Sequence, residues 1–301
     1  MPTCLDSSPR FVHAINVSAW VSQWSTSRRI STEPPPNFNS GRDIPLQALE
    51  GHRASLILVG AQAIYLHTGD ADEAVAAYTT DGDLALDPRM LGREPALEAA
   101  MRAGGFALKV DQVGIWTGAR AIDEKVVTVD LLVPESLGGG GTRGARLTGH
   151  DPKAARKVRG IEGCLVDKST FTIAAFEASD QRRFELEVAG PAALLVSKCH
   201  KLAERIAEGG RRAKSKDAHD VLRVLRGVST DVLALGFTLM RTDEVSRQVA
   251  ETGLDHLQSL FGRPRLAGCD LAAQAAAGLE NEETIRQSCV ALTSNLVAAL
   301  R

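Results

Sequence analysis

The sequence predicts an α/β protein in which a mixed-sheet domain at residues 46–190 precedes a helical domain at residues 191–301. Two observations lead to this prediction. The 301 residues are 44% hydrophobic and 24% charged, which is the profile of a globular chain with one or two cores. Short apolar runs with strand periodicity alternate with helical segments up to Ala189, and Pro191 then opens a series of amphipathic helices.

The composition and the N-terminal segment narrow the class of protein further. No run approaches the roughly 18–20 uninterrupted apolar residues of a membrane helix, and the first residues lack a secretory signal, so we expect a cytoplasmic protein without a membrane partner. Five widely separated cysteines indicate reduced, packing thiols. Residues 1–45 contain Pro34-Pro35-Pro36 and no sustained periodicity, which predicts a poorly ordered N-terminal arm.

The sheet domain is expected to begin with a strand at residues 54–59 that turns at Gly60 into a helix over AQAIYLHTG. A second strand is expected in TTDGDLAL, and a helix in PALEAAMRAGG, closed by Gly104 and Gly105. Further strands are expected in FALKV, GIWTG, KVVTVDLLV, CLVD, FTIAAF and RFELEVA. Helices are expected after Pro191 in AALLVSKCHKLAERIAE, KDAHDVLRVLRG, TDVLALGFTLM, TDEVSRQVAETGLDHLQSLF and EETIRQSCVALTSNLVAAL.

Two aspartates at the start of the second strand indicate a metal site. Asp81 and Asp83 are two residues apart, so the two-residue period of a strand places both carboxylates on the same face. Like charges this close raise each other's pKa unless a cation or hydrogen-bond donors neutralise them, and a divalent ion is a common solution. A simple Asp-Gly-Asp turn, which Gly82 permits, is the alternative.

Asp130 strengthens the metal hypothesis. It lies within VVTVDLLV, a run too apolar for an edge strand, where an unpaired carboxylate would carry a large desolvation cost. We therefore expect Asp130 to have a partner. Three carboxylates on neighbouring strands are the arrangement that holds two Mg²⁺ ions for in-line phosphoryl or nucleotidyl transfer. A local hydrogen bond at the end of the strand is the alternative for Asp130.

Gly60 is a candidate for phosphate binding, because it follows a buried strand and opens a helix. Backbone N–H groups and the positive end of the helix dipole can meet a phosphate at such a position. The chain has no GK[ST] sequence and no GxGxxG after this strand, which excludes the Walker and Rossmann motifs.

A row of cations is expected along the first helix of the helical domain. Lys198, Lys201 and Arg205 follow one another at spacings of three and four beside the buried stripe. The next helix places Asp217 and Asp220 on one side. Ordinary salt bridges between two amphipathic helices would explain this pattern. The functional alternative is that Lys198 neutralises a triphosphate while an acidic residue orients it.

Taken in order, these segments resemble the AbiEii-like and MenT-like nucleotidyltransferase toxins of the DNA polymerase β-like nucleotidyltransferase superfamily, over about residues 54–226. The matching positions are Gly60, Asp81, Asp83, Asp130, Lys198, Arg205, Lys216, Asp217 and Asp220. The chain departs from the pattern at Ala61, where the family usually has serine, and at Ala77, where arginine is frequent. Thr79 and Thr80 are expected to supply some of the missing contacts.

The resemblance implies a mixed-sheet nucleotidyltransferase domain that transfers a nucleoside monophosphate from an NTP to a hydroxyl acceptor and releases pyrophosphate. It implies that Asp81 and Asp83 bind two Mg²⁺ ions, and that Asp130 holds the catalytic ion and helps to deprotonate the acceptor. Lys198 would bind the triphosphate. The remaining implied site residues are Gly60, Ala61 and Thr80 for phosphate binding, and Arg205, Asp217 and Asp220 for orientation.

The same resemblance implies the 3′ end of tRNA as the acceptor and a cognate antitoxin protein as a partner. The basic segments 143–159 and 201–216 are then expected to lie along the RNA backbone. Two alternatives stay open at this point. The acceptor can be a small hydroxylated molecule or a protein hydroxyl, or the chain can be a non-catalytic nucleotide or RNA binder, which Ala61 and Ala77 favour.

Overall fold

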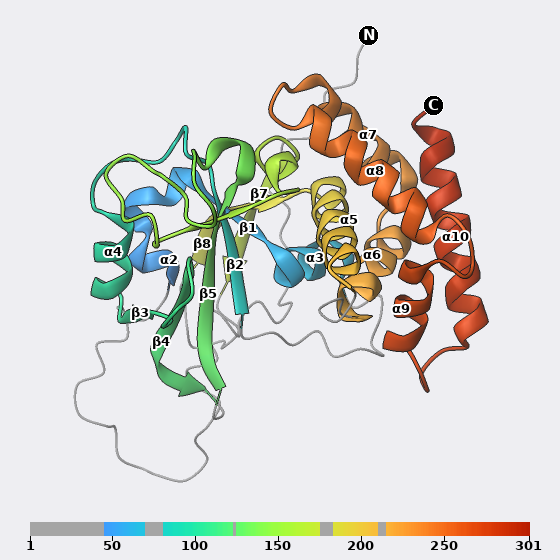
Figure 1. The fold of residues 1–301 in the computed structure, drawn as a ribbon, viewed down its shortest axis with the longest axis horizontal. Coiled ribbons are helices and arrows are strands. Elements are labelled where there is room, and N and C mark those ends of the chain that lie inside the picture. Colours follow the sequence, from blue (N-terminus) through green and yellow to red (C-terminus); the bar gives the residue numbers. More distant parts are fainter. Residues whose placement is uncertain (1–44, 70–80, 123–124, 175–182, 210–214) are drawn as a thin grey trace.

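A sheet part and a helical part lie side by side in the computed structural model, which describes residues 45–69, 81–122, 125–174, 183–209 and 215–301 (Figure 1). Residues 1–44 of the arm expected at residues 1–45 lie outside the described residues, and its last residue, Pro45, begins a helix. Ala77, Thr79 and Thr80 also lie outside the described residues. For Asp81 only the backbone is described.

The sheet part is built on one mixed sheet. Its described strands are β1 (Leu56–Val59), β2 (Asp81–Leu86), β3 (Phe106–Leu108), β4 (Ile115–Ile122), β5 (Lys125–Pro134), β6 (Arg156–Val158), β7 (Lys168–Ala174) and β8 (Arg183–Ala189). Their order is β3-β4-β5-β2-β1-β8-β7, and β6 pairs with β5. The pairs β1–β8, β2–β5 and β5–β6 are parallel and the others are antiparallel. The predicted α/β class with a mixed sheet is therefore confirmed.

Strand β5 lies in the interior of this sheet, as its apolar sequence predicted. It pairs with β4 on one side and with β2 on the other. Leu84 of β2 and Leu131 of β5 are opposite each other in the parallel ladder, and both are fully buried. The same register places Asp83 directly opposite Asp130. The two-residue period that buries the leucines therefore also brings the two carboxylates together on the sheet.

Short helices cover the sheet part. They are α2 (Pro45–Ala48), α3 (Gly60–Thr68) and α4 (Leu97–Ala103), with 3₁₀ helices η1 (Glu50–Ser55), η2 (Glu135–Leu137) and η3 (Glu162–Leu165). The strand expected in CLVD is wrong, because Cys164 and Leu165 end η3, and Val166 and Asp167 form the turn and bend that follow it. A run of three apolar residues does not distinguish a buried strand from a buried helical turn. Here Gly163 packs so closely on Met240 that a Cβ atom would overlap its sulfur.

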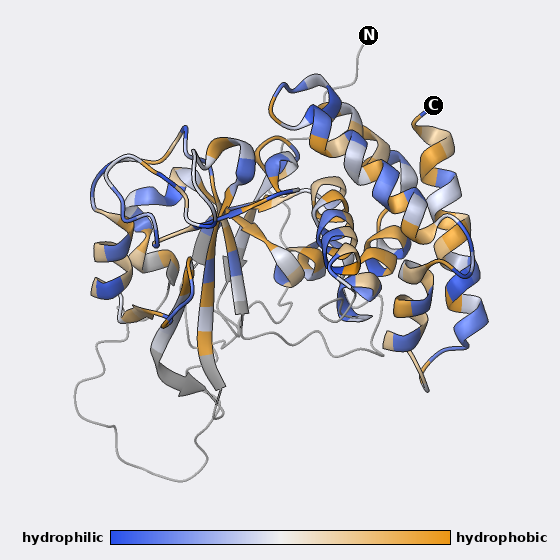
Figure 2. Ribbon diagram, in the orientation of Figure 1, coloured by the Kyte–Doolittle hydropathy of each residue, from blue (hydrophilic) through white to orange (hydrophobic). Residues whose placement is uncertain are grey.

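Helices fill the described part of the chain after Gly190. They are α5 (Pro191–Ala207), α6 (Ser215–Gly227), α7 (Thr230–Thr242), α8 (Arg247–Phe261), α9 (Ala267–Ala275) and α10 (Glu282–Ala299). Figure 2 shows hydrophobic and hydrophilic residues alternating in bands along these helices, as amphipathic helices require. Pro191 opens α5, because its fixed φ and missing N–H suit a first helical turn.

Helix α5 is central to the helical part, since it packs against α6, α7 and α8. The expected helical region is confirmed, with two differences in its elements. The expected helix that ends at Phe261 begins only at Arg247, and α9 was not expected. Within the described ranges, no helix is both long enough and apolar enough to cross a lipid bilayer.

Arg223 joins α3 to the helical part. The residue is 2% exposed, and its guanidinium lies 4.8 Å from the centre of the Tyr65 ring. Its Nε donates to Thr68 Oγ1 at 3.0 Å, and its terminal nitrogen donates to the carbonyl of Gly69 at 3.0 Å. Because Thr68 and Gly69 end α3 and Arg223 belongs to α6, this contact holds the two helices together.

Candidate active site

Gly60 and Asp83 make a close approach at one end of the sheet. Gly60 begins α3 with a φ of +75°, a conformation that side chains other than glycine rarely adopt. A Cβ atom at this position would also overlap Oδ2 of Asp83. The carboxylate of Asp83 therefore lies against the first residue of α3, and glycine is required there for both its conformation and its size. The described neighbour of Gly60 is thus a carboxylate, and the phosphate that the sequence predicted there stays a prediction.

The environment of Asp83 disfavours its charge. Burial and the like charge of Asp130 raise the pKa of Asp83 to about 6, while Lys201, Lys198 and Arg156 act in the opposite direction. A carboxyl group ordinarily ionises near pH 4. Ionised Asp83 therefore remains incompletely neutralised by the described side chains. The sequence predicted such repulsion between Asp83 and Asp81, whose side chain is not described, whereas the structure shows it between Asp83 and Asp130.

Arg156 is the partner of Asp130. Its Nε donates to the two carboxylate oxygens at 2.8 and 3.1 Å, and its terminal nitrogen lies 2.5 Å from Oδ2. Strand β6 brings it there, because the parallel pairing of β6 with β5 aligns Arg156 with Leu132, two residues after Asp130. The expectation of a partner for Asp130 is confirmed. That the partner is Arg156 was missed, because the sequence shows this arginine only as one cation of the basic segment 143–159.

Helices α5 and α6 bring the expected row of cations onto two carboxylates. Lys198 Nζ lies 2.9 Å from Asp217 Oδ1 and 2.6 Å from Asp220 Oδ2. Lys201 and Arg205 also contact Asp217, at 2.9 and 2.6 Å. Although burial favours the neutral acid, Lys198 and Lys201 hold the pKa of Asp217 well below its usual range. Asp217 is thus an ionised centre that fixes all three cations.

Lys198 is buried and stays charged. Burial opposes its charge, but the carboxylates of Asp220 and Asp217 raise its pKa above the ordinary value for lysine. Lys216, the remaining charged position of the sequence motif, lies in the first turn of α6. The salt bridges that the sequence offered as one explanation are present, and the side chains that make them also line a cavity.

A cavity of about 170 Å³ separates the carboxylates of the sheet from the cations of α5. Gly60, Asp83 and Arg156 line it from the sheet part, and Lys198, Lys201 and Arg205 line it from α5. Asp130 lies behind Arg156, and Asp217 and Asp220 lie behind the row of cations. Ala61 is the second residue of α3. Residues more than 100 positions apart in the sequence therefore meet at one site.

Two carboxylates of the sheet are the described candidates for holding a magnesium ion. Across the described ranges, no group of three or more metal-binding side chains is present, and Asp81 contributes only its backbone. Asp83 and Asp130 nevertheless supply hard oxygen ligands at facing positions, and the raised pKa of Asp83 is the condition that a divalent cation relieves. The two carboxylates therefore fit a magnesium ion, provided that the ion pair between Arg156 and Asp130 opens.

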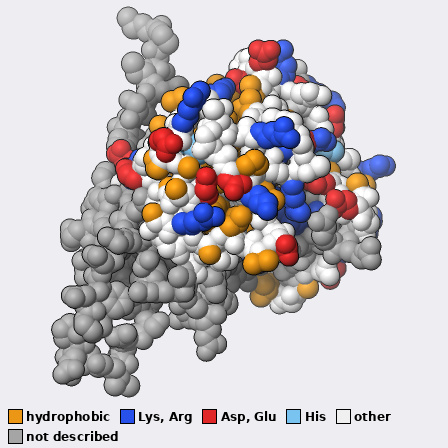
Figure 3. All heavy atoms as spheres, turned by 60° about the vertical axis from the view of Figure 1, so that its left-hand side comes forward, with side chains coloured by type: hydrophobic (Ala, Val, Ile, Leu, Met, Phe, Trp, Pro, Cys, Tyr) orange, Lys and Arg blue, Asp and Glu red, His pale blue; other side chains and the backbone are white. Residues whose placement is uncertain are grey.

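Several side chains of the basic segment 143–159, which was expected to bind RNA, already have partners within the protein. Arg156 binds Asp130, Arg159 binds Glu135 at 2.7 Å, and Lys157 Nζ donates to the carbonyls of Gly139 and Gly141. On the face shown in Figure 3, basic and acidic side chains are interspersed. Removing these three charges together would also disturb the active site, so RNA binding has to be tested at single positions.

A substitution at Gly60 tests the close approach to Asp83. The Gly60→Ala variant is expected to lose about 3 kcal/mol of unfolding free energy, because the backbone strain is joined by overlap with the carboxylate. Gly69→Ala is the matched control, since Gly69 also has a positive φ, of +58°, but no atom lies within 4 Å of its added methyl group. The control is expected to lose less than Gly60→Ala in urea denaturation, about 1–3 kcal/mol from the strain of its φ of +58° and ψ of −148° alone. Equal losses would show that Asp83 does not restrict position 60.

The fold and the site thus define an α/β chain with facing carboxylates and a row of cations on the two sides of one cavity. Comparison with known proteins does not extend this description. No protein-family model, no curated protein and no solved structure matches the chain.

Proposed function

We propose that the chain is a Mg²⁺-dependent nucleotidyltransferase that moves a nucleoside monophosphate from an NTP to a hydroxyl acceptor and releases pyrophosphate. The observation that carries the proposal is the cavity between Asp83 and the cations of α5. Carboxylates on one side suit a metal ion, and Lys198, Lys201 and Arg205 on the other side suit the negative charge of a triphosphate. The resemblance of the sequence motifs to nucleotidyltransferase toxins supports the same reaction.

The proposed reaction assigns a role to each side of the cavity. The acceptor oxygen forms a bond to the α-phosphorus of the NTP, and the bond from that phosphorus to the oxygen bridging the α- and β-phosphates breaks. Asp130 accepts the proton of the acceptor hydroxyl, and Lys201 and Arg205 neutralise the departing pyrophosphate. Asp83 and Asp130 would hold the ion, which would stabilise the negative charge that develops on the attacking oxygen and the α-phosphate.

The wider proposal follows the resemblance. The acceptor is the 3′ end of tRNA, and the protein acts as the toxin of a toxin–antitoxin pair. Small hydroxylated molecules and protein hydroxyls are the competing acceptors. All three share the hydroxyl nucleophile, so the same experiment distinguishes them by where the transferred label is found.

A non-catalytic nucleotide or RNA binder is the second candidate, and one observation favours it. Arg156 occupies the carboxylate of Asp130, as it would in a protein that uses no metal at this position. The cost of burying Asp83 beside Asp130 favours the enzyme, because a site that only binds an anionic nucleotide gains nothing from a second carboxylate.

Incubation with Mg²⁺, each α-labelled NTP in turn and total tRNA tests the proposal. We expect label on RNA from the wild-type protein and none from the Asp81→Asn plus Asp83→Asn double variant. Asp111→Asn is the matched control, because Asp111 is exposed and has a φ of +56°, which asparagine also adopts. It should label RNA like the wild type. Absence of label on RNA, protein and small molecules with every NTP would leave the binding role.

A further inference from the structure

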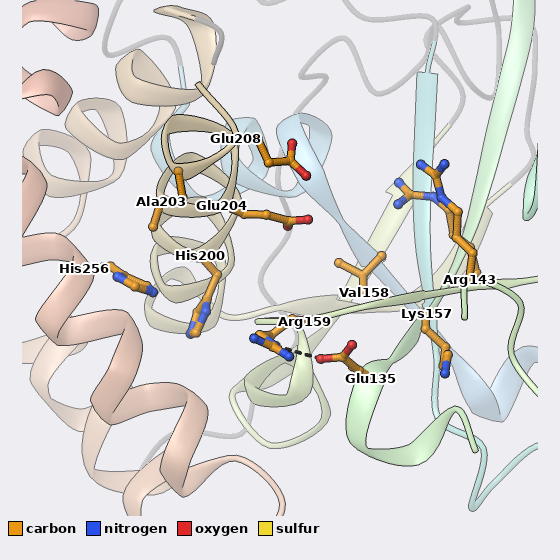
Figure 4. Close-up of a pocket in the computed structure, with 12 residues that line it drawn as sticks. Glu135, Arg143, Lys157, Val158, Arg159, His200, Ala203, Glu204, Glu208 and His256 are labelled. Carbon is orange, nitrogen blue, oxygen red and sulfur yellow. Dashed lines mark hydrogen bonds and ion pairs between the residues drawn. The ribbon is translucent and has the colours of Figure 1, made fainter. Parts of the chain in front are cut away.

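A second, larger cavity of about 590 Å³ adjoins the first one (Figure 4). It lies between the strand β6 region and helices α5 and α8, and its volume falls in the usual range for ligand pockets. The residues that line both cavities are Arg143, Arg156, Val158, Arg159, Glu204 and Glu208. A ligand in the larger cavity therefore reaches the groups around Asp83 and Asp130 without crossing the protein interior.

Arg143 offers an uncommitted positive charge on the sheet side of this cavity. Its side chain is exposed and makes no hydrogen bond or ion pair with any residue that the structure describes, and only its backbone carbonyl is engaged, by the N–H of Lys157. Its basic neighbours in the cavity wall differ, since Lys157 and Arg159 are held by backbone carbonyls and by Glu135. Arg143 can therefore bind a phosphate without losing an internal contact.

The opposite wall is formed by α5 and α8 and has a different character. Figure 4 shows His200, Ala203 and Glu204 on α5, with His256 beside them. The two imidazole rings are perpendicular, with centres 5.0 Å apart, and burial lowers the pKa of both. His200 donates from Nε2 to the carbonyl of Val249, which fixes its ring. His200 is 6% exposed and His256 is half-buried, so this wall presents a neutral ring surface, mainly that of His256, rather than further cations.

Glu204 adds a hydrogen-bond acceptor to the ring surface. Its side chain is exposed on the cavity wall and makes no hydrogen bond within the described ranges, although its charge acts on Arg156, Arg159 and His200. Neutral rings of this kind stack on nucleobases, and a carboxylate accepts hydrogen bonds from ribose hydroxyls. The cavity thus combines a cation that can bind a phosphate, a ring surface that can stack on a base, and a carboxylate that can accept hydrogen bonds from hydroxyls. These groups line a single cavity of the size that small ligands occupy.

We propose that this cavity holds the terminal nucleotide of the RNA acceptor, with its phosphate at Arg143, its base against His200 and His256, and its ribose at Glu204. The inference rests on the proposed nucleotidyl transfer, and it names the place and the orientation of the acceptor. The terminal hydroxyl then faces the shared wall at Arg156, beyond which Asp130 lies.

Binding of a 5′-labelled single-stranded RNA with a free 3′-hydroxyl, measured by fluorescence anisotropy without NTP or Mg²⁺, tests the proposal. Arg143→Gln is expected to weaken binding about tenfold, the effect of losing one charged hydrogen bond. Arg146→Gln is the matched control, because Arg146 is also exposed in the same segment but lines neither cavity. It should leave the affinity unchanged.

The same RNA with a 3′-phosphate tests the ribose position. It is expected to bind the wild-type protein several-fold more weakly, because in the proposed pose the 3′-hydroxyl lies between Glu204 and Arg156, both in the shared wall, and a phosphate there brings its charge onto the carboxylate of Glu204, while Arg156 is already paired with Asp130. Glu204→Gln should reduce this discrimination while it preserves binding of the RNA with a free hydroxyl. Equal affinity of the wild-type protein for both RNAs would overturn the placement of the ribose.

The remaining outcomes separate this inference from the proposed function. Equal weakening by Arg143→Gln and Arg146→Gln, or no RNA binding by the wild-type protein, would overturn the cavity as the acceptor site. So would transfer to RNA with an unchanged acceptor KM in the Arg143→Gln variant. RNA binding that depends on Arg143 but is never followed by transfer would remove the proposed reaction and preserve the binding site.

Discussion

The Asp83→Asn variant is expected to be more stable than the wild-type protein at pH 8 without metal, and to be inactive. Burial and the charge of Asp130 raise the pKa of Asp83 to about 6 from its ordinary value of 3.8. The difference corresponds to about 3 kcal/mol by which ionised Asp83 disfavours the folded state. Asparagine has nearly the same shape and no charge, so it removes this cost and also removes a ligand of the proposed metal site.

The direction of the pH dependence follows from the raised pKa. Folded Asp83 binds a proton more tightly than the unfolded chain does, so its unfavourable contribution grows as the pH rises from about 4 to about 6. It is complete above that range and absent well below pH 4. Urea denaturation of both proteins at pH 4 and pH 8 should therefore show similar stabilities at the lower pH and a more stable variant at the higher pH.

Magnesium should make the wild-type protein the more stable of the two at pH 8. The ion is expected to stabilise the wild-type protein at pH 8, because it binds the folded carboxylates, and to leave Asp83→Asn unchanged. Nucleotidyl transfer should be lost in the variant under the same conditions. A variant that is less stable than the wild type in the absence of metal would show that the charge of Asp83 is already satisfied within the protein, and would remove the physical argument for an ion there.

Replacing Lys198 with methionine is expected to lower the free energy of unfolding by about 3–5 kcal/mol, as the loss of one partner from a buried ion pair does. The Lys198 side chain is 9% exposed, and its carboxylate partners Asp217 and Asp220 are 5% and 2% exposed. Methionine fills similar space but leaves both carboxylates without this cation. Asp217 keeps Lys201 and Arg205, so the larger part of the loss arises at Asp220.

Two further variants check this explanation. Lys201→Met is the matched control, since the Lys201 side chain is 43% exposed and Asp217 keeps its other cations. It should cost less than about 1 kcal/mol. Adding Asp220→Asn to Lys198→Met should recover part of the lost stability, because it removes the unpaired charge. If Lys198→Met and Lys201→Met lowered the free energy of unfolding by similarly small amounts in urea denaturation, the ion pair of Lys198 with Asp220 would not be buried as described.

The carboxylate pair could be predicted from the sequence because it depends on local patterns. The spacing of Asp83 from Leu84 and the apolar surroundings of Asp130 identify two strands and their faces. Their pairing then needs only that the strands be neighbours, which the structure bears out. The row of Lys198, Lys201 and Arg205 could be predicted for the same reason, since a helix repeats its faces every three to four residues.

The contacts of Arg156 could not be predicted in this way. Strand β6 has three residues, too few to show any periodicity, and it lies in a long segment between Gly138 and Glu162. Its pairing with β5 is decided by tertiary contacts. The convergence of three cations on Asp217 likewise depends on how α5 crosses α6, and helix α9 is nine residues rich in alanine without a clear polar face.

The buried contact of Arg223 with the end of α3 bears on how the molecule unfolds. By chain order α3 belongs to the sheet, yet its last turn depends on a donor from α6. Loss of the helices would leave Thr68 and Gly69 without this donor, and loss of the sheet would leave a buried guanidinium without acceptors. The two parts are therefore coupled into one cooperative unit. The cavity at Gly60 exists only in a molecule that has folded as a whole.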